Sequence, residues 1–295
     1  MLRSLITILM LTSMSASGGQ ALYDSASPLF FDETSLLELK PVPALKHEAL
    51  KPDIEAKEAL IMDYDTGLLL YEKNIHEPMP MASLTKIMTA ILILENHDLS
   101  EVVTVESDFA GLEGVRAWLR QGEKLTVGDL LKALLIPSAG DAAIALAEFH
   151  SGTVENFVKA MNTRAKELNL IHTHFVNPIG LDSEGHYSSA YDLAILTKFA
   201  LHFPDFRSIV KMDKATISSV NGKIFHSFES TNYLLNSYLD IQGVKTGTTD
   251  GAGRSLINLA RNDQGHEIIA VILNSPNRFQ ENKSMIDWAF RSYSW

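Results

Sequence analysis

One stretch of the chain decides the fold, and it reads Met79-Pro80-Met81-Ala82-Ser83-Leu84-Thr85-Lys86-Ile87-Met88-Thr89-Ala90. Pro80 disfavours helix at the residue before it, and Ser83 is suited to the first turn of a helix. The apolar residues that follow recur at helical spacing, so the pattern predicts a helix with one face in a core. These residues are Leu84, Ile87, Met88, Ile91 and Leu94.

Ser83 and Lys86 have the spacing of a catalytic pair. Three positions apart, they lie on one face of a helix, where the Lys86 amine can take the proton of the Ser83 hydroxyl. The helix start adds free N–H groups and the positive end of a dipole, which favour an oxyanion beside Ser83. An isolated S-x-x-K motif more often marks only a capped, exposed first turn. The interpretation therefore depends on the rest of the chain.

Two further motifs follow in order. Ser138-Ala139-Gly140 stands at the entry of another apolar helix, with Ser138 expected in its first turn, and Lys245-Thr246-Gly247 stands in a predicted strand. Together with S-x-x-K they resemble the signature of the penicillin-recognising serine enzymes, which is S-x-x-K, then S-x-N, then K-T-G.

Composition limits the function classes. With 295 residues and 46% apolar content, the chain can bury one large core or two modest ones, and we expect a single interleaved unit. A net charge of -11 gives no support to electrostatic binding of nucleic acid or anionic lipid. Cysteine is absent, which excludes disulfides, thiolate nucleophiles and cysteine metal sites.

The N-terminus predicts export. Arg3 precedes a short apolar run at 5–11 and a small, polar run at 13–21, the layout of a secretory signal at 1–21 with cleavage near Ala21. An uncleaved anchor is the alternative, and no other segment resembles a transmembrane helix. Residues 22–52 are proline-rich without periodicity, which predicts an extended leader before a domain at 53–295.

The order of the elements predicts a fold of mixed α/β class, and within that class an α+β arrangement. Strands are predicted at 59–63 and 68–72 around a turn at Gly67, at 216–220 and 223–228 around Asn221-Gly222, and at 255–260 and 267–273. Helices are predicted at 130–135 after a capping pattern at 126–129, and at 141–149, 153–168, 189–202 and 279–290. This order predicts an antiparallel sheet built from both chain ends and flanked by helices, with an inserted helical lobe.

Most of residues 55–292 resemble the low-molecular-mass penicillin-binding proteins of the D-alanyl-D-alanine carboxypeptidase family. Besides the three motifs, the resemblance rests on Tyr64-Asp65-Thr66-Gly67, Gly185-His186-Tyr187-Ser188-Ser189, Ser230-Thr231-Asn232 and Gly243-Val244. It implies a β-lactamase/transpeptidase-like fold and hydrolysis of the terminal D-alanine from peptidoglycan stem peptides. It also implies that β-lactam antibiotics are covalent inhibitors and that no cofactor is needed.

The resemblance also implies residue roles. Ser83 would be the nucleophile, Lys86 the base and Ser138 a proton relay to the departing amine. Lys245 would hold the terminal carboxylate of the substrate. The substrate would lie beside Thr246, Gly247 and Thr248, and the N–H groups of Ser83 and Thr248 would form an oxyanion hole.

One position departs from the family pattern. Gly140 replaces the asparagine of the S-x-N motif, which removes a side-chain amide that could bond Lys86 and the substrate. Water or a nearby side chain such as Asn232 is expected to fill that space.

Several alternatives stay open from the sequence. A class A β-lactamase would need a Glu-x-x-x-Asn in a loop after the middle motif, and residues 168–182 contain no glutamate. A cell-wall-binding homologue that has lost turnover is favoured only by Gly140. A DD-endopeptidase that cuts peptidoglycan crosslinks shares all the motifs. The histidines of His172-Thr173-His174 are read as loop residues rather than as a metal site, because no suitable third ligand follows.

The predicted location follows from the signal and from the length of the chain. The short C-terminal end predicts a soluble exported enzyme of the periplasm or cell-wall space, with no anchor beyond the N-terminal signal.

Overall fold

The computed structural model describes residues 41–46 and 50–295. The predicted signal at 1–21 and residues 22–40 of the predicted leader lie outside the described residues. The first large elements are β2 (Glu58–Asp63) and β3 (Leu69–Lys73), which form an antiparallel hairpin. Gly67 takes a φ of 76° at its turn, a conformation that glycine adopts without steric cost. The predicted hairpin is therefore confirmed.

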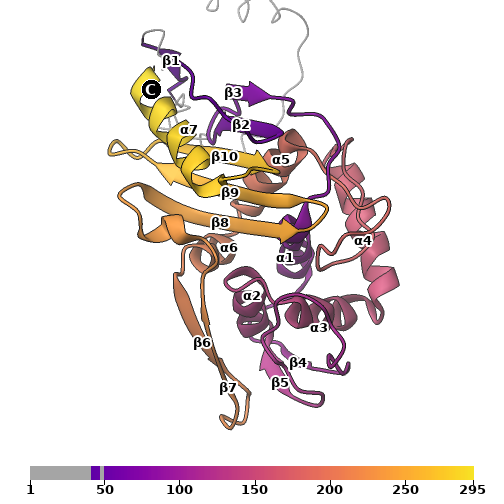
Figure 1. Cartoon of the computed structure of the whole chain (residues 1–295). Helices are drawn as coiled ribbons and strands as arrows, with labels where there is room; N and C mark the ends of the chain where they lie inside the picture. Colours follow the sequence, from indigo (N-terminus) through magenta and orange to yellow (C-terminus); the bar gives the residue numbers. More distant parts are fainter. Residues whose placement is uncertain (1–40, 47–49) are drawn as a thin grey trace, which may run out of the picture. The chain divides into compact units, whose positions relative to one another are not determined.

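A five-stranded antiparallel sheet forms the centre of the fold. Its other strands are β8 (Asp240–Thr249), β9 (Gly253–Arg261) and β10 (Glu267–Leu273), in the order β3-β2-β10-β9-β8 (Figure 1). Because β2 pairs with β10, the early and late parts of the chain meet in the middle of the sheet. The prediction of an antiparallel sheet built from both chain ends is confirmed.

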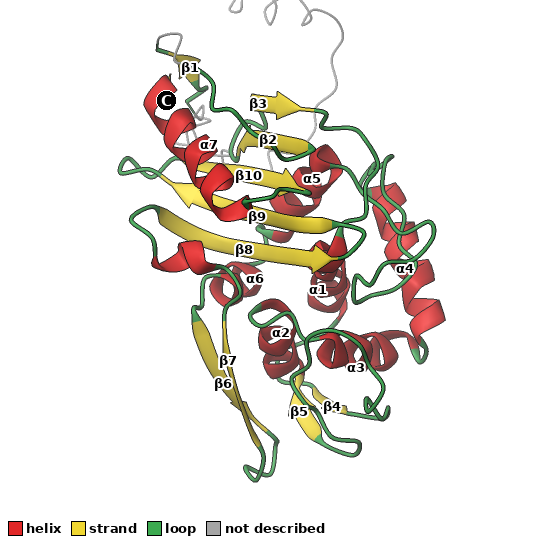
Figure 2. Ribbon diagram, viewed as in Figure 1, coloured by secondary structure: helices red, strands yellow, loops and turns green. Residues whose placement is uncertain are grey.

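Alternate residues of each inner strand enter two different cores. Leu60 and Met62 of β2 pack with the helical lobe, whereas Ala59 and Ile61 pack with the C-terminal helix α7 (Arg278–Ser292). This follows from the period of two along a strand, which sends neighbouring side chains to opposite faces. Figure 2 shows α7 on one face and α5 (Ala190–Ala200) on the other.

The remaining helices form a lobe between β3 and β8. They are α1 (Lys86–Asn96), α2 (Val127–Leu135), α3 (Gly140–Ser151), α4 (Val154–Glu167) and α6 (Pro204–Val210). The side chains of Thr126, Thr153 and Ser189 accept backbone hydrogen bonds at the starts of α2, α4 and α5. The predicted inserted helical lobe is therefore confirmed.

Some short elements differ from the prediction. Pro204 follows the helix predicted at 189–202 and occupies the first turn of a further helix, α6, where its missing N–H costs nothing. The second hairpin is β6 (Lys214–Ser218) with β7 (Phe225–Glu229). Its pairing stops at Ser218 and Phe225, so Asn221-Gly222 lies in a longer loop rather than in a two-residue turn.

Other short elements were not predicted. One is the hairpin of β4 (Val102–Thr104) and β5 (Lys124–Thr126), which flanks a polar segment that contains Gly111, Gly114 and Gly122. β1 (Ala44–Leu45), within the predicted leader, pairs with β11 (Tyr293–Ser294). Two 3₁₀ turns, η1 (Ala82–Thr85) and η2 (Tyr233–Asn236), precede α1 and β8. Across 41–46 and 50–295, no helix combines the length and hydropathy needed to span a bilayer.

Candidate active site

Ser83 and Lys86 are in hydrogen-bond contact where η1 runs into α1. The Nζ atom of Lys86 lies 3.0 Å from Oγ of Ser83. The Lys86 side chain is buried, with only 2% of the residue exposed. Burial lowers the pKa of Lys86 to about 7, against an opposing effect of the Asp141 carboxylate. A large fraction of Lys86 is therefore neutral near neutral pH, as a base requires.

The loop at 177–182 supplies the second partner of Lys86. Lys86 Nζ donates a hydrogen bond of 2.5 Å to the carbonyl oxygen of Ile179. The Asn177 side chain holds this loop in shape, because its Oδ1 accepts the backbone N–H of Gly180 at 2.7 Å. The Asn-Pro-Ile-Gly sequence at 177–180 is typical of a tight loop, and nothing in it indicates contact with Lys86.

Gly180 packs directly against the backbone of Ala82 and Ser83. A Cβ atom at Gly180 would lie 2.1 Å from the carbonyl oxygen of Ala82 and 2.8 Å from the nitrogen of Ser83. Gly180 also has a φ of 86°, which side chains rarely adopt. Only glycine lets the loop approach the Ala82–Ser83 peptide this closely.

Ser138 lines the same pocket as Ser83 and Lys86. This pocket has a volume of about 100 Å³, and Ser83, Lys86, Ser138, Gly140 and Thr248 are among the residues that line it. The prediction that Ser138 sits in the first turn of a helix is wrong. α3 begins at Gly140, and Ser138 precedes it with a φ of 73°. Its buried Oγ has no hydrogen-bond partner among the described residues, so it is free to bond a ligand in the pocket.

β8 carries the K-T-G motif along the edge of the sheet. Lys245 is buried, and its Nζ donates to the carbonyl oxygen of Thr246 at 2.9 Å. Burial and the charges of Lys86 and Arg278 hold the pKa of Lys245 well below its usual range. A Cβ atom at Gly247 would lie 3.0 Å from Cβ of Ala82 and 3.3 Å from the nitrogen of Ser83. Glycine therefore allows β8 to pass close to η1.

Arg278, which the sequence did not indicate, binds the end of this strand. Its Nη1 donates to the carbonyl oxygen of Gly247 at 2.7 Å and to Oγ1 of Thr248 at 2.6 Å. Arg278 follows β10 in the chain, and no local motif surrounds it. Only the antiparallel sheet brings its guanidinium to β8, which is why reading the sequence missed it.

The structure corrects the part of the expectation about Gly140 that concerns Asn232. Gly140 is the first residue of α3, and a Cβ there would make ordinary contacts, the nearest at 3.5 Å to Leu112 and Val115. Asn232 does not fill the space of the missing amide, because its own amide donates to Oδ1 of Asn258 at 2.7 Å. The Ile179 carbonyl contacts Lys86 instead.

Asn232 begins a buried chain of amides that crosses the sheet. Asn258 donates to Oδ1 of Asn282 at 2.8 Å, and Asn282 donates to the carbonyl oxygen of Ala270 at 3.2 Å. The chain connects the start of η2 with β9, α7 and β10. These hydrogen bonds fix the segment at 230–232 relative to the sheet.

The two histidines considered for a metal have other contacts. Nδ1 of His174 is 2.7 Å from the carbonyl oxygen of Gly185, and the ring of His172 lies beside that of His76. In the described part of the chain, no three His, Cys, Asp or Glu side chains are arranged to hold a metal ion.

Comparison with known proteins agrees with this geometry. Residues 45–277 match the peptidase S11 family, described as D-alanyl-D-alanine carboxypeptidase. The chain belongs to this family. The peptidase S11 match includes all three motifs and extends through β10. The predicted family resemblance is therefore confirmed.

Individual relatives of this family are similar over most of the chain. D-alanyl-D-alanine carboxypeptidase DacF of Bacillus subtilis is 39% identical over 81% of the chain. The matched region spans only 63% of the length of that relative. A D-alanyl-D-alanine endopeptidase of Pseudomonas aeruginosa is 33% identical over 70% of the chain and 68% of its own length. The DD-transpeptidase of Streptomyces K15 superposes with a TM-score of 0.78 at 32% identity, covering 82% of the chain and 100% of that structure.

Proposed function

We propose that this chain is a serine D-alanyl-D-alanine carboxypeptidase that trims the terminal D-alanine from peptidoglycan stem peptides. The observation that carries the proposal is the 3.0 Å contact between Ser83 Oγ and the buried Lys86 Nζ. Membership of the peptidase S11 family supports the same reaction. The activity and the residue roles below are parts of this proposal.

Acylation begins with Ser83 and Lys86. Neutral Lys86 takes the hydroxyl proton as Ser83 Oγ attacks the carbonyl carbon between the two D-alanines. The N–H groups of Ser83 and Thr248 stabilise the resulting oxyanion. The close approach of Gly247 to Ser83 supports this placement, because it brings the next residue of β8 beside the nucleophile.

The C–N bond then breaks, and Ser138 passes a proton to the departing amine. The free D-alanine leaves, and the rest of the stem peptide stays bound to Ser83 Oγ as an ester. Water attacks the ester with Lys86 again as base, which releases the shortened peptide and restores the Ser83 hydroxyl. The unpartnered, buried Oγ of Ser138 supports its place in this relay.

Cationic side chains would bind the terminal carboxylate of the substrate. Lys245 and Arg278 lie at β8. Burial and nearby positive charges lower the pKa of Lys245, and a bound carboxylate would favour its charged form. Thr246 and Thr248 add hydroxyl groups along the same strand. A β-lactam with a carboxylate at the equivalent position would acylate Ser83 and remain attached. The absence of a glutamate at 168–182 supports this persistence.

Product analysis tests the proposal. The purified protein is incubated with a pentapeptide ending in D-Ala-D-Ala, and free D-alanine and the tetrapeptide are quantified. Equal amounts of the two products are expected, with none from Ser83→Ala. Fluorescent penicillin is expected to label the native protein and not Ser83→Ala. A folded protein that neither labels nor releases D-alanine would instead be a binding homologue, and rapid penicillin turnover would indicate a β-lactamase.

The pH dependence of acylation follows from Lys86. Its pKa is lowered to about 7, and only the neutral amine can accept the Ser83 proton. Acylation by penicillin is therefore expected to slow by about tenfold per pH unit below this pKa and to level off above it. Stopped-flow acylation rates across this range check the prediction. A rate that does not change on the acid side would exclude Lys86 as the base.

Gly140→Asn is expected to accelerate acylation. The first turn of α3 has room for a Cβ, and an added amide would reach toward Lys86 and the substrate. A hydrogen bond to a charged group contributes roughly 1.5 to 3 kcal/mol, which corresponds to about tenfold to a hundredfold in rate. The second-order rate of penicillin acylation is measured for both proteins, with thermal stability as a control. A stable variant that acylates no faster would show that the Ile179 carbonyl suffices.

The substrate determines where the protein acts. Peptidoglycan lies outside the cytoplasmic membrane, so we place the enzyme in the periplasm or cell-wall space, exported by the predicted signal at 1–21. Its partners there are stem peptides and, as inhibitors, β-lactams. Fractionation of cells producing the full chain tests this location. Activity confined to the cytoplasm would contradict it.

Cleavage of crosslinks is the second candidate activity. It uses the same acyl-enzyme, but the leaving group is a second stem peptide rather than one D-alanine. The similarity to the D-alanyl-D-alanine endopeptidase of P. aeruginosa favours it. Product analysis on a crosslinked dimer, beside the pentapeptide, distinguishes the two activities.

A further inference from the structure

A surface groove of about 550 Å³ begins next to the catalytic pocket. The segment at 116–120 forms one wall and β7 forms the other. Arg116 and Pro137 line the groove, whereas their chain neighbours Val115 and Ser138 line the pocket. We call it the Trp118 groove. It is formed mainly by Arg116, Trp118, Arg120, Pro137, Phe225 and Glu229.

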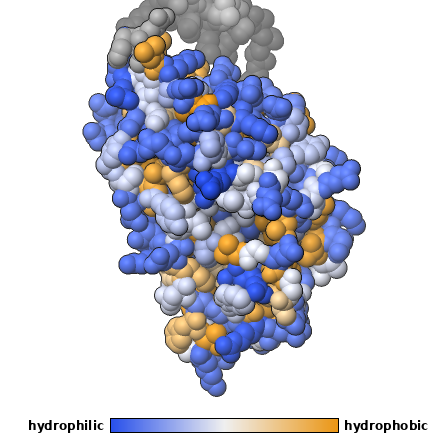
Figure 3. All heavy atoms as spheres, viewed as in Figure 1, coloured by the Kyte–Doolittle hydropathy of each residue, from blue (hydrophilic) through white to orange (hydrophobic). Residues whose placement is uncertain are grey.

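The volume of this groove suits a ligand better than the pocket does. Binding sites for small molecules commonly measure about 300 to 1,000 Å³. The catalytic pocket, at about 100 Å³, is smaller than that range. Figure 3 shows apolar and strongly hydrophilic side chains alternating over the part of the surface that contains the β6–β7 hairpin. Such a surface fits a chain with both apolar and charged groups.

Trp118 is held rigidly in an exposed position. It is 68% exposed, with a φ of 63°, which is rare for a bulky residue. The N–H groups on either side, of Ala117 and Leu119, donate to the buried carboxylate of Asp141 at 2.9 and 3.1 Å. The guanidinium of Arg116 lies 3.9 Å from the ring centroid. A fixed aromatic side chain with one face supported can bind a ligand at little cost in entropy.

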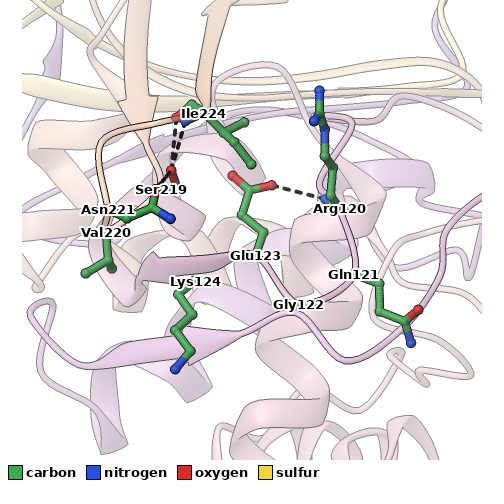
Figure 4. A pocket seen from close by; sticks show the side chains of 9 residues that line it. All are labelled: Arg120, Gln121, Gly122, Glu123, Lys124, Ser219, Val220, Asn221 and Ile224. Carbon is green, nitrogen blue, oxygen red and sulfur yellow. Dashed lines mark hydrogen bonds between the residues drawn. The ribbon is translucent and has the colours of Figure 1, made fainter.

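The charges of the groove favour an anionic ligand. Arg120 is exposed, and among the described residues its guanidinium has no ion pair or side-chain hydrogen bond. A neighbouring hollow lies between the loop at 120–124 and the loop at 219–224, and there Arg120 and Lys124 extend in opposite directions (Figure 4). Arg116 and Arg120 therefore form a local cationic site on a chain of net charge -11. Glu229 lies on β7 and provides one negative group.

The position of the groove points to the leaving-group side of the reaction. Pro137 directly precedes Ser138, the proposed proton donor to the departing amine. On the other wall, Glu229 ends β7 two residues before Thr231, whose Oγ1 is 2.5 Å from Oγ1 of Thr246 in the K-T-G motif. A leaving D-alanine whose carboxylate is held at Lys245 would end near this point, and a longer leaving group would continue into the groove.

We propose that the Trp118 groove binds the second stem peptide of a crosslinked peptidoglycan dimer, the part that leaves during cleavage. Arg116 and Arg120 contact its carboxylates, and Trp118 packs against its aliphatic side chains. This inference rests on the proposed function, since it concerns the same acyl-enzyme. It gives crosslinked dimers a binding site that free pentapeptides do not reach.

The experiment compares two substrates in four proteins. The kcat/KM for a crosslinked dimer and for a pentapeptide is measured for the native protein, Trp118→Ala, Arg120→Gln and the control Lys124→Gln. Trp118→Ala is expected to lower kcat/KM for the dimer about tenfold, and Arg120→Gln about two- to fivefold. The pentapeptide values and all values for Lys124→Gln are expected to stay unchanged. Higher salt is expected to weaken the effect of Arg120.

Other results would overturn the inference. Equal losses of kcat/KM on both substrates would show that the groove binds the first stem peptide or supports the fold. An unchanged kcat/KM for the dimer would show that the groove does not bind the second stem peptide. Thermal unfolding of each variant separates misfolding from lost binding, and Arg120→Gln tests the groove even if Trp118→Ala unfolds. Should the native protein cleave neither substrate, the proposed function fails. In that case calorimetry compares the affinity of the crosslinked dimer for the Ser83→Ala variant and for the double variant Ser83→Ala, Arg120→Gln. Equal affinities would overturn the inference.

Discussion

Replacing Lys86 with methionine is expected to slow acylation by about a thousandfold. A positioned general base contributes about 10² to 10⁴ in rate, and Lys86 Nζ is the basic group in contact with Ser83 Oγ at 3.0 Å. Methionine has nearly the same length and suits a buried site, so the change removes the base and little else. The second-order rate of penicillin acylation measures the loss. Lys124→Met, at an exposed lysine on β5, is the control.

The same variant is expected to be more stable than the native protein. Burial lowers the pKa of Lys86 from 10.5 in a model peptide to about 7, so the folded state opposes its charge. This cost is largest below the folded pKa and decreases as pH rises toward the unfolded value. Lys86→Met should therefore raise the melting temperature most at low pH and least at high pH. A variant that acylates normally, or that melts lower at every pH, would contradict this account.

Replacing Gly180 with alanine is expected to cost both stability and activity. The new Cβ would meet the Ala82 carbonyl oxygen at 2.1 Å, and the φ of 86° is unfavourable for alanine. Overpacking of this kind costs roughly 1 to 3 kcal/mol, and the positive φ adds about 1 to 2 kcal/mol. Either η1 or the loop must move. A displacement of about 1 Å at the nucleophile can reduce the rate about a hundredfold.

Gly185→Ala separates the two causes of this effect. Gly185 has a φ of 80°, yet the nearest atoms to a Cβ there are 3.8 Å away, on His174 and Val176. It therefore carries the cost of the positive φ without the clash, and its acylation rate should be close to native. Chemical denaturation and penicillin acylation are measured for both variants. Equal behaviour of the two would show that the contact of Gly180 with Ala82 does not position Ser83.

The sequence predicted what local patterns control. Side-chain caps such as Thr126 and Ser189, the turn at Gly67 and the run of apolar residues in β10 depend on neighbouring residues, and these elements appear where the patterns placed them. The three motifs could be recognised for the same reason, because each consists of residues that are close together in the sequence. The first two motifs meet at one pocket with Thr248, which directly follows the K-T-G motif on β8. This meeting follows from the antiparallel sheet, which the order of strands and helices already indicated.

What the sequence missed depends on contacts between distant segments. Arg278 reaches Thr248 across 30 positions, and Ile179 reaches Lys86 across 93. Neither spacing leaves a local pattern. Ser138 was placed in a helix because its neighbours are apolar, yet Ala139 is extended and α3 starts only at Gly140. A backbone carbonyl such as that of Ile179 cannot be recognised from residue type at all.

The chain of amides from Asn232 through Asn258 to Asn282 has a consequence for the ageing of the protein. Each amide donates to the oxygen of the next, so the hydrogen bonds all run in one direction. Deamidation of Asn258 would put a carboxylate oxygen opposite Oδ1 of Asn282, where a donor is required. Repulsion between the two oxygens would then separate β9 from α7. Chemical damage far from Ser83 would in this way displace the segment that leads into the K-T-G strand.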